Sequence, residues 1–258
     1  MTPDDQPSLD RPDGSEEPPS TFAAIRELVV VLVLALGLSA VLHTFIAQSN
    51  YVPSRSMMNT LLVNDKLLVS RITTRVEGVH RGEVVVFADP GGWVNQPEPD
   101  GFAKTWRDVL VFLHLADERP QLVKRIVALG GDNVKCCDAQ GRIAVNGVYI
   151  DEPYIRGTRS DQMSFKVTVP KGRVFVMGDN RSDSRDSRFH LEEHNGGVPV
   201  EDVLGRVVMR IWPLNRIARL TIPDTFDRVP APRPDQLIDD SDNTVRPTAG
   251  PQDTYLPE

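Results

Sequence analysis

The stretch Leu122-Val-Lys-Arg-Ile-Val-Ala-Leu129, followed at once by Gly130-Gly-Asp132, decides the fold class of this chain. It is a short apolar, β-branched run that ends in turn-forming residues, which is the pattern of a buried strand. Six further runs of this kind lie on both sides of it: Lys66 to Ser70, Glu83 to Phe87, Arg142 to Val148, Ser164 to Val169, Arg173 to Met177 and Arg206 to Trp212. The sequence therefore predicts a mostly β domain with few short helices.

Two local signals refine this β prediction. Asn146-Gly147 separates Ile143-Ala-Val145 from Val148-Tyr-Ile150, and this dipeptide is a strong signal for a two-residue hairpin. The segment from Phe102 to Leu115 is the one convincing helix candidate in this region, because its apolar residues recur at helical spacing. We expect its apolar face to pack on the core, and a position on a bilayer surface is the alternative.

A long apolar run precedes the β region. Leu28 to Leu42 contains no charged residue, and the run continues weakly to Ala47. About 20 helical residues cross a bilayer, so residues 22–47 predict one transmembrane anchor helix. A cleaved signal peptide is one alternative, but such a peptide carries a shorter apolar stretch behind a basic segment. A buried core helix is the other, but this run is apolar on every face.

The two ends of the chain and its overall charge limit the possible functions. Residues 1–21 and 226–258 are rich in Pro and acidic residues and predict disordered tails, which leaves residues 48–225 for the folded domain. The formal charge of −7 and the pI near 5.3 argue against a nucleic-acid partner, which favours a basic face on the protein.

The only two cysteines, Cys136 and Cys137, are adjacent, so they are two free thiols or one vicinal disulfide.

Two segments carry residues suited to acyl-transfer chemistry. Pro53-Ser-Arg-Ser-Met-Met-Asn-Thr-Leu61 places two serines on either side of one residue, just after the apolar run. Lys124 lies inside the strand-like stretch, where a charged ammonium is costly and burial lowers the lysine pKa. A neutral lysine can take the proton of a serine hydroxyl, as in Ser-Lys nucleophilic catalysis. The alternative is that Lys124 lies on an open strand edge and reaches water.

Four segments behind the apolar run resemble the bacterial type I signal peptidases, which are the Ser-Lys dyad leader peptidases. That family has, in order, a membrane anchor, a serine box, a Gly-Asp-type strand box, a lysine box and a Gly-Asp-Asn-Arg loop. The matching segments lie between about Gln48 and Trp212 and read Pro53-Ser-Arg-Ser-Met-Met-Asn-Thr-Leu61, Arg81-Gly-Glu-Val-Val-Val-Phe87, Lys124-Arg-Ile-Val-Ala-Leu-Gly-Gly-Asp132 and Gly178-Asp-Asn-Arg-Ser-Asp-Ser-Arg-Asp-Ser-Arg188. The resemblance implies a membrane-anchored serine endopeptidase on a signal-peptidase-like β domain.

The resemblance also implies a role for each matching polar residue. Ser56 corresponds to the nucleophile and Lys124 to the general base. Ser54 corresponds to the hydroxyl that holds the oxyanion together with the Ser56 backbone N–H. The other matching residues orient the lysine or brace the loop that does so: Ser184, Asp186 and Arg188. No cofactor and no metal ion is implied.

For binding, the resemblance implies that an extended substrate segment lies between two strands, at residues 50–52 and 121–123. Shallow apolar pockets for the small residues before a cleavage site are expected near four side chains: Val52, Met57, Leu122 and Val123. The expected partners are the signal peptides of secretory preproteins and the lipid bilayer. The family further implies a single-pass protein of the cell membrane, with residues 1–21 in the cytoplasm and the catalytic domain on the extracytoplasmic side. The charges that flank the apolar run leave this orientation open.

Some residues depart from this pattern or fit a rival one. Asn59 and Gly130 stand where the family often has proline. His190-Leu-Glu-Glu-His194 matches the H-x-x-E-H zinc-peptidase pattern, but that motif needs a helix, and Asn195-Gly196-Gly197 follows at once. We therefore expect no metal site there. The rival functions are a membrane-tethered binding module of the same fold without turnover, and another Ser-Lys processing peptidase.

Overall fold

The computed structural model describes residues 25–35, 48–94, 101, 119–157 and 163–233. The chain divides into two compact units, Met1–His43 and Thr44–Glu258. In the first unit, residues 25–35 form a helix whose apolar side chains are exposed. No helix among the described residues is long and apolar enough to cross a bilayer. The anchor predicted over residues 22–47 lies only partly within those residues.

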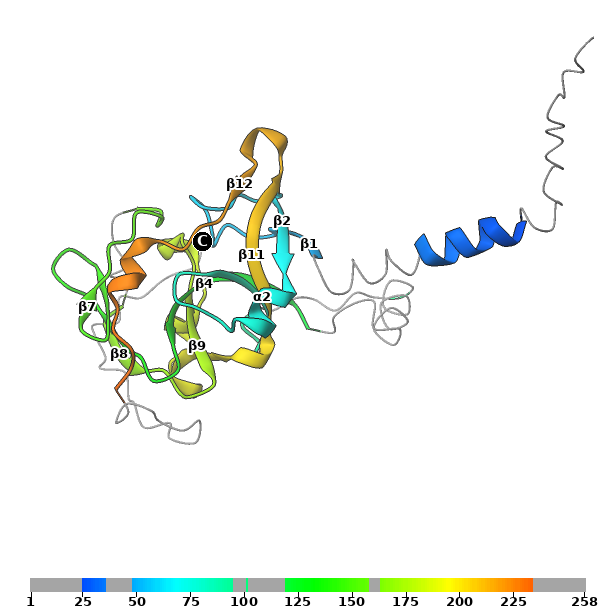
Figure 1. Cartoon of the computed structure of the whole chain (residues 1–258). Helices are drawn as coiled ribbons and strands as arrows, with labels where there is room; N and C mark the ends of the chain where they lie inside the picture. Colours follow the sequence, from blue (N-terminus) through cyan, green and yellow to red (C-terminus); the bar gives the residue numbers. More distant parts are fainter. Residues whose placement is uncertain (1–24, 36–47, 95–100, 102–118, 158–162, 234–258) are drawn as a thin grey trace, which may run out of the picture. The chain divides into compact units, whose positions relative to one another are not determined.

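A large sheet forms the body of the second unit, in the order β1-β2-β11-β3-β4-β9-β10, with β12 paired to β11 (Figure 1). Its ladders are antiparallel. The strands are β1 (Gln48–Tyr51), β2 (Lys66–Ser70), β3 (Val84–Ala88), β4 (Gln121–Leu129), β9 (Arg173–Met177), β10 (Gly197–Pro199), β11 (Val203–Trp212) and β12 (Ala218–Arg219). The middle strands β3 and β4 are buried on both faces, which explains why their sequences are nearly continuous apolar runs.

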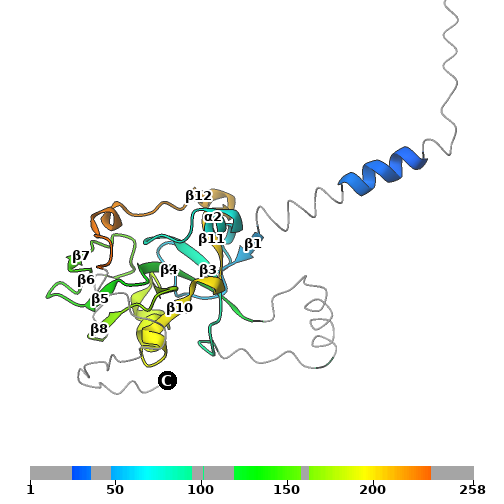
Figure 2. The same cartoon turned by 60° about the horizontal axis from the view of Figure 1, so that its bottom comes forward.

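A smaller antiparallel sheet has the order β7-β6-β5-β8, and Figure 2 shows its strands together at the left of the view. Its buried side chains pack against those of β4 and β9. Its strands are β5 (Asn133–Cys136), β6 (Ile143–Val145), β7 (Val148–Tyr149) and β8 (Phe165–Thr168). Val145 faces Val148 across the predicted two-residue turn. Asn146 and Gly147 have φ of 51° and 84°, the left-handed values that a type I′ turn requires. The hairpin prediction is therefore confirmed.

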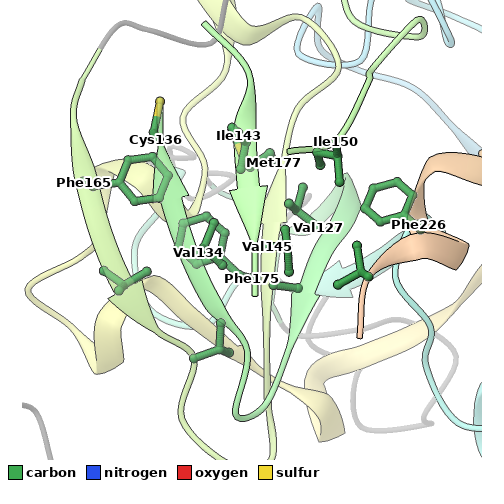
Figure 3. Close-up of a cluster of buried hydrophobic side chains, with 14 of the residues drawn as sticks. Val127, Val134, Cys136, Ile143, Val145, Ile150, Phe165, Phe175, Met177 and Phe226 are labelled. Atoms are coloured by element: carbon green, nitrogen blue, oxygen red, sulfur yellow. The ribbon is translucent and has the colours of Figure 1, made fainter. Parts of the chain in front are cut away.

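Figure 3 shows the apolar core that joins the two sheets. Its buried members come from both sheets and from the C-terminal segment, and they include Val127, Val134, Ile143, Phe165, Phe175, Met177 and Phe226. Phe226 and Val229 are only 5% and 7% exposed. The folded part of the chain thus continues past residue 225, where the sequence placed its end, because two apolar side chains interrupt an otherwise polar segment.

The middle strands of the large sheet separate two further cores. Successive strand residues point to opposite faces, so β3 and β4 contribute to both. On what we call the Val123 face, the buried side chains include Val52, Met57, Val84, Val86, Val123 and Val207. On the opposite Leu122 face they include Val85, Phe87, Trp93, Ile126 and Val176, with Leu122 packed against them. On β4, the side chain of Lys124 points to the same face as those of Leu122 and Ile126, because these residues are two positions apart.

The mostly β prediction is confirmed, since each predicted run contains a strand. Strands β5, β10 and β12 were not predicted, because they are short and carry polar residues, glycine or proline. The helix predicted from Phe102 to Leu115 lies outside the described residues. The described helices of this unit are α2 (Arg71–Val76) and the 3₁₀ helices η1 (Arg181–Asp183), η2 (Ser187–Phe189), η3 (His194–Gly196), η4 (Val200–Asp202), η5 (Leu214–Arg216) and η6 (Asp224–Arg228). Cys136 and Cys137 form a vicinal disulfide.

Candidate active site

The serine box forms a compact turn between β1 and β2. Inside it, the Leu61 N–H donates to the Met57 carbonyl at 2.8 Å, and both side chains are buried in the core below. This anchoring leaves Ser56 largely buried, with 6% of its surface exposed. The hydroxyl oxygens of Ser54 and Ser56 lie 3.1 Å apart. The two serines singled out in the sequence therefore share a hydrogen bond.

The loop that follows β9 holds the serine box in place. The Asn180 N–H donates to the Ser56 carbonyl at 2.9 Å, and the Asn180 side-chain amide donates to the Arg55 carbonyl at 3.1 Å. Gly178 lies against the backbone carbonyl of Ser56. A Cβ atom at this position would overlap the Ser184 side chain and would lie 2.5 Å from the Ser56 carbonyl oxygen. Only glycine fits this close approach. Gly178 thus lets Ser184 and Ser56 come together, although they are distant in sequence.

Lys124 enters the site from the middle of the large sheet. It lies on β4 opposite Val85 of β3, and only 3% of its surface is exposed. The alternative that the Lys124 side chain reaches water is therefore wrong. Lys124, Ser54 and Ser56 line one cavity of about 500 Å³. The structure thus brings the predicted lysine and both predicted serines to a single space.

Burial dominates the electrostatics of Lys124. It lowers the lysine pKa from 10.5 to about 8, because the charged ammonium loses its hydration. The Asp186 carboxylate opposes this shift, and the Arg188 guanidinium adds to it. A lysine with such a pKa is neutral in part of the molecules at neutral pH, which is the state that can accept a proton.

Asp186 organises the remaining predicted residues. Its carboxylate accepts hydrogen bonds from the Ser184 hydroxyl at 2.7 Å and from the Gly178 N–H at 3.0 Å. Arg188 donates to the same carboxylate through Nε at 2.8 Å. Burial alone would raise the pKa of Asp186, but the Arg188 charge and hydrogen bonds hold it below its usual value. Ser184 is therefore fixed by an ionised carboxylate.

Two buried ion pairs brace this loop, and sequence reasoning did not identify them. Arg125 donates to both carboxylate oxygens of Asp179, at 2.9 and 2.7 Å, and its guanidinium lies 4.0 Å from the centre of the Tyr154 ring. Arg181 binds Glu152 at 2.8 Å. Arg125 and Asp179 belong to the lysine box and to the Gly-Asp-Asn-Arg loop, but nothing in their sequence positions says that they pair. The first pair joins β4 to the loop that holds the Ser56 carbonyl, and the second joins that loop to the segment after β7.

The residues expected to form substrate pockets fall on opposite faces of the sheet. Val52, Met57 and Val123 pack together on the Val123 face and are 1%, 1% and 9% exposed. Leu122 lies on the other face and lines the cavity with Ser56.

Two strand edges also stay open among the described residues. Strand β1 pairs with β2 only, and residues 122–124 of β4 pair only with β3, since the register with β9 starts at Arg125.

The departure at Asn59 has a local explanation. Asn59 has φ of 93°, a value that proline cannot adopt, and its amide donates to the Tyr154 carbonyl at 2.9 Å.

The segment from His190 to His194 contains a turn and no α-helix, and the His190 ring stacks on Trp93 with ring centres 4.4 Å apart. The helix that a zinc-peptidase motif needs is absent from this described segment, and no group of three potential metal ligands occurs in the described part of the chain.

A buried lysine and a serine hydroxyl that line the same cavity, on a mostly β scaffold, are typical of serine peptidases that use lysine as the base. Comparison with known proteins defines the class further. The model of the family "Signal peptidase, peptidase S26" matches residues 25–212. The chain belongs to this signal peptidase family, whose members are serine endopeptidases, and the predicted enzyme class is confirmed.

Curated relatives agree with this assignment over most of their length. A probable signal peptidase I of Mycobacterium leprae is 33% identical, over 77% of this chain and 80% of the relative. A probable signal peptidase I-2 of Synechocystis is 35% identical, over 80% of this chain and 81% of the relative. The signal peptidase I of Leptolyngbya laminosa is 33% identical, over 88% of this chain and 95% of the relative.

Proposed function

We propose that this chain removes signal peptides from secretory preproteins, with Ser56 as the nucleophile and Lys124 as the general base. The supporting observation is that both side chains line one cavity, where burial lowers the pKa of the lysine to about 8. Ser54, whose hydroxyl lies 3.1 Å from that of Ser56, is proposed to hold the oxyanion together with the Ser56 N–H. Ser184 is proposed to orient Lys124, with Asp186 and Arg188 fixing that serine.

The proposed reaction has two acyl-transfer steps. Neutral Lys124 Nζ takes the proton of the Ser56 hydroxyl as Ser56 Oγ attacks the carbonyl carbon of the scissile bond. The tetrahedral oxyanion accepts hydrogen bonds from Ser54 and the Ser56 N–H, and the Lys124 ammonium then protonates the leaving amine. Water, deprotonated by Lys124, next attacks the ester at Ser56. The signal peptide leaves with a free carboxylate, and Ser56 recovers its proton.

We propose that the substrate binds as an extended segment along the open edges of β1 and β4. Main-chain groups of residues 122 and 123 lack a ladder partner on the β9 side, so they can pair with an added strand. The core on the Val123 face closes that side of the substrate. It leaves room only for small side chains, such as those of an A-x-A-like cleavage site.

The site of action is also part of the proposal. We propose that residues 22–47 anchor the protein as a single span in the cell membrane. The support is the uncharged run from Leu28 to Leu42, together with the helix over residues 25–35. By analogy with the family, residues 1–21 are then cytoplasmic and the catalytic domain extracytoplasmic. A substrate held in the same bilayer has a raised effective concentration at the site.

Covalent labelling tests the nucleophile. A peptidyl probe with a serine-reactive phosphonate and alanine at the scissile position should form a one-to-one adduct, and peptide mass spectrometry should place it on Ser56. The Ser54→Ala protein serves as control, because it keeps the nucleophile and should still be labelled, only more slowly. An adduct elsewhere in the chain would disprove the assignment. A folded protein that neither reacts nor cleaves preproteins would favour a binding module without turnover.

The pH dependence of cleavage follows from the lowered pKa of Lys124. Only neutral Lys124 accepts a proton, so kcat/KM should rise with pH and level off above the lysine pKa of about 8. At pH 7 about a tenth of the molecules would carry the neutral amine, far more than for an unshifted lysine. A profile of kcat/KM between about pH 6 and 10, at constant ionic strength, measures this. A flat profile would contradict the role of Lys124.

A further inference from the structure

A second cavity, of about 670 Å³, opens at the end of the serine box, where Asn59 and Thr60 line it. Its other walls come from β4, from the segment after β7, and from β11, β12 and the segment that follows β12. Among the described residues, it shares no lining residue with the cavity of Lys124 and Ser56. A hollow of this volume has the size of a small-molecule site.

Arginine side chains determine the charge of this cavity. Four arginines and two aspartates line it: Arg125, Arg210, Arg219, Arg228, Asp151 and Asp224. Arg125 already binds the Asp179 carboxylate, and Asp151 pairs with Arg142. Three guanidinium groups then remain against the single carboxylate of Asp224. A concave surface with such an excess of one charge attracts ligands of the opposite charge, so the cavity favours anions.

Arg210 is a largely buried cation with little compensation. Its side chain is 14% exposed, and its hydrogen bonds go to neutral carbonyls, from Nη1 to Thr60 at 2.6 Å and from Nε to Arg216 at 2.5 Å. The one carboxylate within 4 Å among the described residues is that of Asp65, 3.9 Å away, and Arg216 holds this carboxylate at 2.7 Å.

The pKa of Arg210 reports the same deficit. Burial lowers this pKa from its usual value, the charge of Arg216 lowers it further, and Asp65 opposes the shift. Arginine nevertheless stays charged at neutral pH. The folded protein therefore holds a guanidinium that is only partly neutralised, and an anion beside it would supply the missing charge.

The remaining walls suit an anion that carries an organic part. Arg219 of β12 and Arg228 of η6 are exposed and make no ion pair within the described residues. Three segments, β11, β12 and η6, thus bring guanidinium groups to one space. Leu220 and Ile222, both partly buried, line the same space. The cavity therefore offers charged donors together with an apolar wall, as small-molecule sites usually do.

We propose that this cavity binds a phosphate ester, whose phosphate lies among Arg210, Arg219 and Arg228 and whose organic part lies on Leu220 and Ile222. A guanidinium donates two parallel N–H groups to phosphate or carboxylate oxygens. A phosphate offers more oxygens and more charge than a carboxylate, so it serves three guanidinium groups better. The phosphate can belong to a soluble ester or to a lipid headgroup. The site does not depend on the proposed function, because cleavage takes place in the other cavity.

Calorimetric titration of the full chain in a non-ionic detergent tests the site. Glycerol 3-phosphate represents the soluble esters, and dihexanoyl phosphatidic acid represents the lipid headgroups. We expect one or both to bind at one site per chain and to raise Tm, because only the folded state has the site. Binding of only one probe would identify the source of the phosphate. The carboxylates glycerate and hexanoate should bind at least about tenfold more weakly. A chain that binds neither phosphate probe, or that binds the carboxylates equally well, would overturn the proposal.

Two double variants locate the bound phosphate. Arg219→Gln/Arg228→Gln removes two exposed cations, which should leave the fold intact, and it should weaken phosphate binding about tenfold. Arg75→Gln/Lys166→Gln changes the net charge equally, but its residues are exposed and lie outside the cavity, so the affinity should stay that of the wild type. An undiminished affinity in the first variant would overturn the site. An equal loss in both variants would also overturn it, because overall charge would then explain the binding.

Discussion

Replacing Lys124 by methionine should lower kcat/KM by at least about 10⁴-fold, the scale on which loss of a catalytic base acts in serine peptidases. Methionine has nearly the length of lysine and fills the same buried space, so the change removes only the amine. Ser56 would then keep its place and its hydrogen bond to Ser54 but would have no acceptor for its proton. The remaining rate would come from substrate binding and the oxyanion donors.

The same substitution should stabilise the fold at neutral pH. The pKa of Lys124 is about 8 in the folded protein and 10.5 in its unperturbed state, so the unfolded chain binds more protons between these two pH values. Stability of the wild type therefore rises with pH across that window, and below it the buried ammonium disfavours folding. Methionine carries no charge and removes this cost. A higher Tm together with lost activity would separate a catalytic role from a structural one.

Peptide cleavage and thermal unfolding of the purified variant measure both effects. Lys135→Met, which removes an exposed lysine from β5, is the matched control and should change neither. The double variant Ser56→Ala/Lys124→Met should be no slower than either single variant, because groups that act as a unit are not additive. An active, folded Lys124→Met protein would rule out the dyad.

The positions of Ser56 and Lys124 show how much of the site the sequence predicts. The strand that carries Lys124 could be predicted, because a buried middle strand must be apolar along its whole length, and a lysine inside such a run is conspicuous. Ser56 could be singled out only through the motif around it. The distance between these residues could not be predicted from the pattern, since it depends on how Asn180 and Gly178 dock against the serine box.

Other parts of the site leave no sequence signal. Trp93, which lines the cavity with Ser56, lies in a Gly- and Pro-rich loop, where neither periodicity nor composition marks a wall of a cavity. The division of Leu122 and Val123 between two faces follows from strand alternation, but which face stays open depends on residues packed from elsewhere. The folded domain also continues to Phe226 and Val229, because a segment that is polar on average can still bury single side chains.

Removing the carboxylate of Asp179 should destabilise the protein by about 3–5 kcal/mol, the usual cost of leaving a buried charge without its partner. In Asp179→Ala the guanidinium of Arg125, which is 3% exposed, would lose both of its bonds to the carboxylate. The next residue, Asn180, positions the Ser56 carbonyl, so catalysis should weaken as well. Urea unfolding and peptide cleavage measure the two losses.

Two further variants separate charge burial from loss of contacts. Asp151→Ala breaks an exposed ion pair with Arg142 and should change the unfolding free energy far less, because water already solvates both partners. Arg125→Met/Asp179→Leu removes both buried charges and should be more stable than Asp179→Ala. The double variant should nevertheless cleave slowly, because apolar side chains cannot replace the bidentate bond that joins β4 to the loop holding Ser56. Wild-type activity in that variant would show that this ion pair does not position the site.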